Sequence, residues 1–258
     1  NSAIQRAFFV DGKLPYSELA MVDFNRVWVN GAYEEYTDEN GIVVRKWDKD
    51  NQGNDLKPSP IEQPEWCTHG LYDTNGYISD EMSIYLEAGQ HTLTLLSMRE
   101  PMLLRSITLS NHSRPAAYVD VKAAGDAASH QDATGVSVRF EAENAVKTSS
   151  QMQDQSSAVV YPMSARYLLN NSIGSSWKNA GQWIEWAFEV PQDGYYEISM
   201  VDKQNFVRGI DVYRKIMIDG EVPFAEFNAQ PFSYTQTWRI ETLSDEDGNA
   251  YRVYLTAG

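Results

Sequence analysis

The clearest fold signal in the chain is the stretch Ile184-Glu185-Trp186-Ala187-Phe188-Glu189-Val190-Pro191-Gln192-Asp193-Gly194-Tyr195-Tyr196-Glu197-Ile198-Ser199-Met200. Large apolar residues alternate with acidic or small ones over residues 184–190, which predicts a strand with one buried face. Residues 191–194 have the composition of a turn, and residues 195–200 continue as a second strand. No segment of the chain shows sustained helical periodicity, so we expect antiparallel β-structure.

A hairpin signal occurs twice in the sequence. Residues 6–16 (RAFFVDGKLPY) closely match residues 214–224 (RKIMIDGEVPF), with an offset of 208 between Asp11 and Asp219. Each copy contains an Asp-Gly pair, which suits a tight turn because glycine accepts positive φ. Three further pairs follow in the same order: Trp28 with Trp238, residues 37–41 with 244–248, and residues 85–89 with 254–258. We infer a tandem repeat.

The matched blocks define the expected domains. We predict a first β-sandwich module at residues 1–110, with an insertion at about 42–80, and a second module at residues 136–258. Residues 111–135 are rich in Ala, Ser, Asp and Gly, which favours a linker with one short helical turn near 123–128. The second copy ends where the first continues into apolar segments, and the first lacks the long segment that opens the second. We therefore expect both modules to be incomplete at the termini.

Composition excludes several classes of partner. The formal net charge is −15, so a polyanion would be repelled, and we expect neither nucleic acid nor anionic lipid to bind. Cys67 is the single cysteine, and no intramolecular disulfide is possible. No apolar run approaches the ~18 residues that a membrane span requires, so we expect no membrane insertion. Short strands separated by frequent turn signals favour a β-sandwich over βαβ units.

Two segments carry a resemblance to a known family. Residues 140–145 (FEAENA) resemble the opening strand of carbohydrate-binding modules of families six and thirty-five. Residues 181–186 (GQWIEW), followed by Val190-Pro191 and Gly194-Tyr195-Tyr196, are similar to the next diagnostic segment of those families. Residues 169–174, Trp177 and residues 214–220 more narrowly resemble the paired modules that precede the solute-binding domain of long bacterial carbohydrate ABC-transporter lipoproteins. The resemblance covers most of residues 136–258 and, through the repeat, most of residues 1–110.

This resemblance implies an all-β, antiparallel jelly-roll β-sandwich that binds sugar through loop aromatics. It also implies a structural calcium ion, because the family's two calcium-binding glutamates match Glu141 and Glu143. Two carboxylates at i and i+2 on one strand face suit a hard cation that takes oxygen ligands. The family's further aspartate ligand has no counterpart in the first copy, where Arg105-Ser106 stands near that position.

Trp177 is the leading candidate for sugar contact, because it follows a loop signal at residues 174–176 and an indole offers a flat apolar face. The alternative is a tryptophan folded back onto its own module.

Trp183 differs by three positions from Trp186, so the two point to opposite faces; we expect Trp186 in the core and Trp183 outside. Trp28 and Trp238 are expected in the core. Planar amide and guanidinium groups suited to vicinal hydroxyls lie in the predicted neighbouring loops: Asn179, Gln204, Asn205 and Arg208. Ordinary solvated loop residues are the alternative for each.

We find no catalytic motif. The four histidines lack a nearby Ser or Cys elbow, and the acidic pairs Asp38-Glu39 and Asp245-Glu246 lie in predicted turns, which explains them better than a glycosidase pair does. We therefore expect non-catalytic binding of an oligo- or polysaccharide at the bacterial cell surface, by extracellular accessory modules of a solute-binding protein or glycoside hydrolase. Neighbouring domains of a longer chain are the other expected partners. The alternative is a structural or interaction β-sandwich without a sugar ligand.

Overall fold

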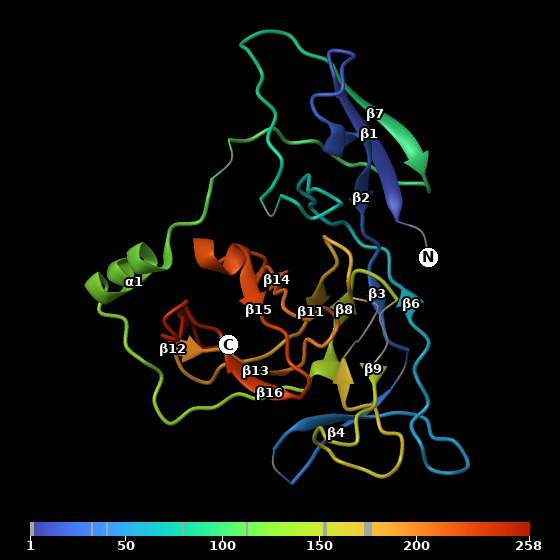
Figure 1. Ribbon diagram of the computed structural model, residues 1–258, viewed down its shortest axis with the longest axis vertical. Helices are drawn as coiled ribbons and strands as arrows, with labels where there is room; N and C mark the ends of the chain where they lie inside the picture. Colours follow the sequence, from blue (N-terminus) through green and yellow to red (C-terminus); the bar gives the residue numbers. More distant parts are fainter. Residues whose placement is uncertain are drawn as a thin grey trace. The chain divides into compact units, whose positions relative to one another are not determined.

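A computed structural model describes residues 3–31, 33–39, 41–78, 80–111, 113–151, 154–172 and 177–258 (Figure 1). The chain forms two compact units. Unit 1 contains Asn1–His112 and Arg139–Ala187, and unit 2 contains Ser113–Val138 and Phe188–Gly258. The units therefore interleave along the sequence. Most of the predicted linker belongs to unit 2, and much of the segment that opens the second copy belongs to unit 1.

Unit 1 is built from short antiparallel pairs. Its sheets are β2-β1-β7, β11-β8-β3-β6, β4-β5 and β10-β9. The elements are β1 (Ile4–Val10), η1 (Ser17–Ala20), β2 (Val22–Phe24), β3 (Trp28–Val29), β4 (Glu34–Thr37), β5 (Val43–Lys46), β6 (Ile61–Glu62), β7 (Leu93–Arg99), η2 (Ala142–Asn144), β8 (Lys147–Thr148), β9 (Asp154–Gln155), β10 (Asn171–Ser172) and β11 (Ile184–Glu185), where η marks a 3₁₀ helix.

Unit 2 combines three two-stranded antiparallel sheets with one α-helix. The sheets are β12-β17, β13-β16 and β14-β15. The elements are α1 (Tyr118–Ala127), β12 (Gly194–Glu197), β13 (Ser199–Asp202), β14 (Val212–Arg214), η3 (Ala225–Asn228), β15 (Gln230–Phe232), β16 (Arg239–Thr242) and β17 (Arg252–Leu255). The predominance of antiparallel strands in both units confirms the all-β class. None of the helices in the described residues is both long and apolar enough to cross a membrane.

Two local predictions need correction. The strand expected over residues 184–190 is reduced to β11 (Ile184–Glu185), because its partner β8 offers only Lys147–Thr148. The short helical turn expected near residues 123–128 is part of α1 (Tyr118–Ala127), which starts five residues earlier. The turn at residues 191–194 and the strand after it form as predicted, with a break between β12 and β13.

The two matched hairpins have the same local structure. Each turn is closed by two backbone hydrogen bonds, between Val10 and Lys13 and between Ile218 and Glu221. The aspartate φ is 50° at Asp11 and 52° at Asp219, and the following glycine is also left-handed. The elements η1 and η3 start 208 residues apart, as do β2 and β15.

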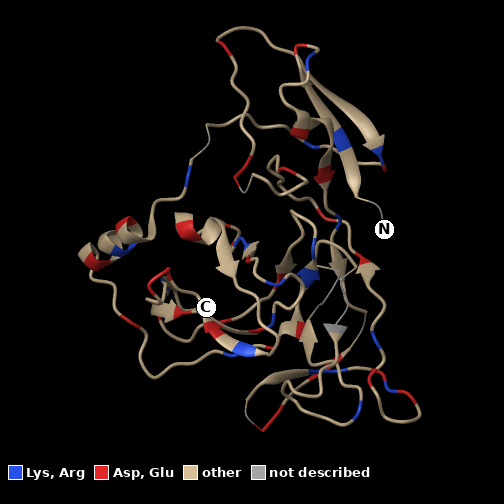
Figure 2. Cartoon of the chain, viewed as in Figure 1, with Lys and Arg blue, Asp and Glu red and all other residues tan. Residues whose placement is uncertain are grey.

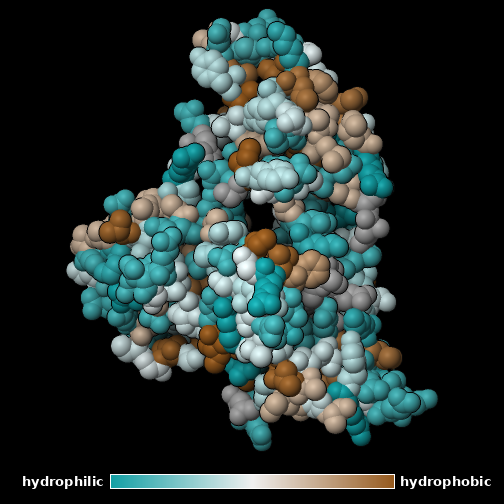
Figure 3. All heavy atoms as spheres, in the orientation of Figure 1, coloured by the Kyte–Doolittle hydropathy of each residue, from teal (hydrophilic) through white to brown (hydrophobic). Residues whose placement is uncertain are grey.

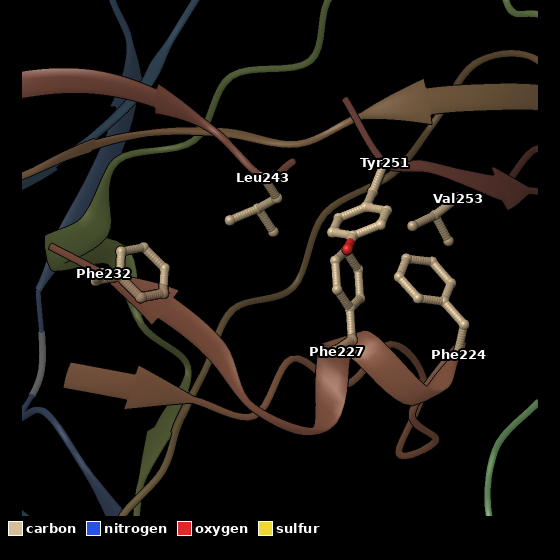
Figure 4. Close-up of a cluster of buried hydrophobic side chains, with 6 residues drawn as sticks. All are labelled: Phe224, Phe227, Phe232, Leu243, Tyr251 and Val253. Carbon is tan, nitrogen blue, oxygen red and sulfur yellow. The ribbon is translucent and has the colours of Figure 1, made fainter. Parts of the chain in front are cut away.

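Each hairpin places one apolar side chain from its 3₁₀ helix at the centre of a core. Leu19 of η1 has no exposed surface and packs with Phe8 and Val22. Phe227 of η3, also without exposed surface, packs among the residues drawn in Figure 4: Phe224, Phe232, Leu243, Tyr251 and Val253. Leu19 and Phe227 therefore occupy equivalent positions in the two copies, and we call them the central core residues.

Different segments complete the two cores. Leu71 from the predicted insertion packs against the Leu19 core, as do Met82 and Ile84 just after it. Its Asp73 is buried and accepts backbone hydrogen bonds from Asn75 and Tyr77. The Phe227 core is instead completed by side chains of unit 2, including Tyr118 of α1, Ile198 and Met200. The insertion therefore has a structural role in unit 1.

An aspartate-centred turn also recurs. Asp245 Oδ1 accepts the Asn249 backbone N–H at 2.8 Å, and Asp38 Oδ1, in the block that the sequence pairs with it, accepts that of Ile42 at 2.9 Å. A third turn of this kind lies at Asp50, whose Oδ1 accepts the Asn54 backbone N–H at 2.9 Å. At Asp50 and Asp245 the asparagine side chain also donates to the aspartate, which lowers the carboxyl pKa of both.

The tryptophans fall into distinct environments. Trp28 is buried, as predicted, whereas Trp186 and Trp238 are half-buried. Within the insertion, Trp47 is buried with its ring 5.2 Å from that of Tyr33, while Trp66 is exposed.

The contribution of the two central core residues, Leu19 and Phe227, to stability can be tested as a matched pair. We expect Leu19→Ala to lower the unfolding free energy by ~2–5 kcal/mol and Phe227→Ala by ~3–5 kcal/mol, because each leaves a cavity in a closed core. Chemical denaturation measures the loss, and hydrogen exchange assigns it to unit 1 or unit 2. Leu56→Ala, at an exposed leucine, should cost less than ~0.5 kcal/mol. Equal losses of unfolding free energy in Leu19→Ala and Leu56→Ala would contradict a central core position for Leu19.

A pH dependence is expected at the start of β7. His91 Nδ1 lies 2.7 Å from Asp11 Oδ2, and this hydrogen bond raises the pKa of His91 above 6.5 and lowers that of Asp11 below 3.8. The backbone oxygen and the charge of Glu87 act on His91 in the same direction. The histidine's stabilising effect is full below pH 6.5 and is lost as pH rises through its folded-state pKa. The aspartate's effect is present above pH 3.8 and is lost as pH falls through its lowered value.

We therefore expect the amides at the start of β7 to lose protection from hydrogen exchange as the pH rises from 6.5 through the raised pKa of His91, beyond the intrinsic rate change. His91→Gln should remove this extra loss. An unchanged pH profile in His91→Gln would assign the effect to other groups.

Candidate functional site

The six residues predicted to contact sugar are divided between the two units. Trp177, Asn179 and Trp183 belong to unit 1, and Gln204, Asn205 and Arg208 belong to unit 2. Neither unit by itself brings the six together.

Trp177 is half-buried, and its indole closes the loop in which it stands. Its Nε1 donates to the backbone oxygen of Gln182 at 3.0 Å. The side-chain oxygen of Gln182 accepts the backbone N–H groups of Lys178 and Asn179, each at 2.9 Å. The polar edge of Trp177 is therefore used within the chain, and only its ring face can serve a ligand. Residues 174–176, which supplied the loop signal, lie outside the described residues.

The other predicted contacts are arranged in different ways. The Asn179 side chain is exposed, and Trp183 is half-buried. Gln204 is buried and holds its own loop together: Nε2 donates to the Ile210 oxygen and Oε1 accepts the Phe206 N–H, both at 2.9 Å. A buried amide requires such partners, so Gln204 positions the loop that exposes Asn205 and Arg208.

The two predicted calcium ligands do not lie on a strand. Glu141 immediately precedes the 3₁₀ helix η2 and Glu143 lies within it, so the expected i, i+2 strand geometry is wrong. Both are buried, and Glu141 Oε1 lies 2.8 Å from the Arg139 guanidinium. Burial raises the pKa of Glu141, an effect that Arg139 partly offsets. Among the described residues no group of three or more His, Cys, Asp or Glu side chains is placed to hold a metal. Calcium binding at Glu141 and Glu143 stays a prediction.

Arg45 explains why η2 forms in this segment. Its buried guanidinium donates to the backbone oxygens of Glu143 at 3.2 Å, Asn144 at 3.1 Å and Ala145 at 3.0 Å. Three otherwise orphaned carbonyls at the end of a helix are thereby satisfied. The guanidinium also lies 4.0 Å from the centre of the Tyr33 ring. This long-range contact replaces the predicted strand with a helical turn.

Unit 2 contains an open groove, which we call the α1 groove. It has a volume of about 400 Å³ and lies along α1, β12 and β17. It is lined by Val121, Lys122, Ala124, Gly125, His130, Tyr195, Pro223, Phe224, Arg252, Val253 and Tyr254. Figure 2 shows charged residues of both signs on α1. Lys122 pairs there with Asp126 at 2.5 Å.

Aromatic rings form one wall of the α1 groove. The rings of His130 and Tyr254 are stacked, with centroids 3.7 Å apart and planes 16° from parallel. Tyr195 meets Tyr254 edge-on, at 5.5 Å and 76°. The Arg252 guanidinium lies 5.4 Å from the Tyr195 ring centre and 2.5 Å from Asp132 Oδ1. The groove thus combines aromatic rings with Arg252, whose guanidinium is held by Asp132.

Gly125 allows α1 to approach Tyr195 closely. It is the buried residue of α1, and a Cβ at this position would overlap the Tyr195 hydroxyl. Only glycine lets the tyrosine approach the helix so closely.

The sequence held partial signals for this groove. Arg252 and Tyr254 are two positions apart, so a strand prediction puts both on one face. Tyr195 belongs to the stretch that decides the fold. His130 was missed, and α1 was predicted only as a short turn near residues 123–128, because the small, polar composition of this segment resembles a linker.

Comparison of the chain with protein-family models, with curated proteins and with solved structures gives no match. The function therefore has to be argued from the geometry of the two units. Figure 3 shows a surface that is largely hydrophilic on the face in view, with small, scattered apolar groups.

The close approach at Gly125 can be tested directly. We expect Gly125→Ala to destabilise unit 2 by ~1–3 kcal/mol, because the added methyl overpacks the contact. Tyr195→Phe removes the nearest atom, and the double variant should recover part of the loss. Thermal unfolding of the four proteins completes the cycle. If the stability losses of the two single variants simply add in the double variant, Gly125 and Tyr195 are not in contact.

Proposed function

We propose that the chain is a non-catalytic carbohydrate-binding protein and that the α1 groove of unit 2 binds the saccharide. The observation that carries this proposal is the aromatic wall of His130, Tyr195 and Tyr254 beside the Arg252–Asp132 pair. An aromatic face packs against the C–H side of a pyranose. Guanidinium and carboxylate groups form bidentate hydrogen bonds with neighbouring hydroxyls.

The groove also has the size and composition expected of a small-ligand site. Its volume of about 400 Å³ accommodates a mono- or disaccharide. Apolar lining residues such as Val121 and Pro223 surround a few converging polar groups. Arg252 and Asp132 hold each other in place before a ligand arrives, which reduces the ordering cost of binding.

The wider proposal rests on the family resemblance. We infer that the chain belongs to a longer protein of the bacterial cell surface, in which jelly-roll β-sandwich modules assist a solute-binding domain or a glycoside hydrolase. Weak affinity at one site would be raised by tandem display. The half-buried Trp177, with the exposed Asn179 two residues later in the same loop, is a second candidate contact in unit 1.

A structural role without a sugar ligand is the second candidate function. It is favoured by the inward use of predicted contact groups: the Trp177 indole N–H and both ends of the Gln204 amide are bonded within the chain. Under this alternative, neither the α1 groove nor the Trp177 loop would bind a glycan.

A glycan array followed by affinity gels separates these possibilities. We expect Tyr254→Ala and Arg252→Lys each to weaken binding about three- to tenfold, because they remove a stacking face and a bidentate donor. Tyr213→Ala, at an exposed tyrosine outside the groove, is the matched control. Trp177→Ala tests the second contact.

Far-ultraviolet circular dichroism should establish that each variant is folded. If only Trp177→Ala loses binding, the binding site lies in unit 1 and not in the α1 groove. No binding of the parent chain to any glycan would favour the structural role.

A further inference from the structure

The charged residues that line the α1 groove differ in sign from those of the chain as a whole. The sequence contains 36 acidic residues against 21 lysines and arginines. Among the described residues that line the groove, none is an aspartate or a glutamate, whereas three are of the basic types: Lys122, His130 and Arg252. A site for a neutral ligand does not require this separation of charge. The lining therefore bears on which substituent the ligand carries.

The acidic partners of the two cations lie outside the lining. Lys122 Nζ is 2.5 Å from Asp126 Oδ2, and the aspartate side chain is 55% exposed against 36% for the lysine. Arg252 Nη1 is 2.5 Å from Asp132 Oδ1, and the exposed fractions are 56% for the aspartate and 30% for the arginine. In each pair the cation lines the groove, and the more exposed carboxylate does not.

The two cations reach the groove from different elements. Lys122 belongs to α1 and Arg252 belongs to β17. A guanidinium has five N–H donors and an ammonium group has three, so one carboxylate contact leaves further donors on each for a ligand. A phosphate or sulfate ester presents three terminal oxygens in different directions and can accept from both elements at once. A planar carboxylate pairs best with a single guanidinium.

The negative charge of the chain does not exclude such a ligand. The formal net charge is −15, but exposed charges more than ~8 Å apart are largely screened at physiological ionic strength. Charge-assisted hydrogen bonds act at ~2.7–2.9 Å and are about twice as strong as neutral ones. A small anion held directly by Lys122 and Arg252 is therefore favoured locally. A polyanion, which would extend over the acidic surface, is not.

We propose that the saccharide of the α1 groove carries a phosphate or sulfate ester, and that Lys122 and Arg252 together bind this group. The inference rests on the proposed function, in which the sugar ring packs on the aromatic wall of His130, Tyr195 and Tyr254. The groove volume of about 400 Å³ is sufficient for one sugar and its ester group. Lys122 is then a specificity-determining residue, which selects the charged sugar over the neutral one.

Four monosaccharides that differ only at carbon 6 test the proposal: glucose, glucose 6-phosphate, glucose 6-sulfate and glucuronate. Amide NMR spectra of the isotopically labelled whole chain measure each affinity, and the shifted signals locate the site. We expect the better of the two esters to bind the groove at least about fivefold more tightly than glucose or glucuronate. The two ester titrations show whether phosphate or sulfate is preferred. Inorganic phosphate should bind more weakly than the better ester, because it lacks the sugar ring.

Matched charge variants test the role of Lys122. Lys122→Gln should lower the ratio of ester affinity to glucose affinity at least about threefold. Lys203→Gln, at an exposed lysine of unit 2 outside the lining, should leave the ratio unchanged. Asp126→Asn removes the carboxylate that competes for Lys122 and should raise the ratio, whereas Asp120→Asn, in the first turn of the same helix, should not. A purely structural role for the lysine would change the affinities for all the sugars alike and leave the ratio constant.

Three outcomes would overturn the inference while leaving the proposed function in place. The first is equal affinity for glucose and both esters, which would leave a site for a neutral sugar. The second is binding of glucuronate as tight as that of the better ester, which would assign the site to a carboxylate. The third is an affinity ratio unchanged by Lys122→Gln.

Two further outcomes would contradict the proposed function as well. One is binding of inorganic phosphate as tight as that of glucose 6-phosphate, because the sugar ring would then contribute nothing. The other is the absence of shifted groove signals with all four sugars at concentrations that detect millimolar affinity.

Discussion

Two consecutive left-handed residues constrain the path of the chain through each hairpin. Asp11 with Gly12, and Asp219 with Gly220, adopt positive φ, a conformation open to glycine and tolerated by aspartate. A two-residue turn of this type matches the right-handed twist of the flanking strands and therefore fixes their register. With the register fixed, the chain returns through an extended Tyr16 or Phe224 into a 3₁₀ helix. Leu19 or Phe227 then points into the core. The same local constraint thus gives two hairpins of equal geometry in different surroundings.

The surroundings of the two hairpins differ. In unit 1 the hairpin is covered by β7 and by Leu71, Met82 and Ile84. In unit 2 the core is covered in part by α1, and the space between this helix and the β12–β17 pair is the α1 groove. A single helix therefore both completes the core and forms a wall of the groove. The tight contact between Gly125 and Tyr195 links these two roles.

Buried polar side chains stabilise the segments that lack regular strand pairing. Arg45, Asp73 and Gln204 each satisfy several backbone groups in such segments. Unpaired N–H and C=O groups are costly to bury there. Gln204, a predicted sugar contact, is therefore used within the chain. The α1 groove differs, because its aromatic rings and Arg252 line open space.

Local patterns were sufficient to predict the antiparallel β class, the duplicated Asp-Gly hairpin and the turn at residues 191–194, because φ preference and period-two alternation act between near neighbours. They also placed Trp28 in a core. The tertiary structure alone decided which segments share a unit. Thr148 pairs with Trp28, and Arg45 caps carbonyls about 100 residues away. Such pairings turn residues 141–144 into a helical turn and bring residues 139–187 into unit 1. Nothing in a short window encodes the partner of a strand or of a guanidinium, since that choice depends on competition among all the segments of the folded chain.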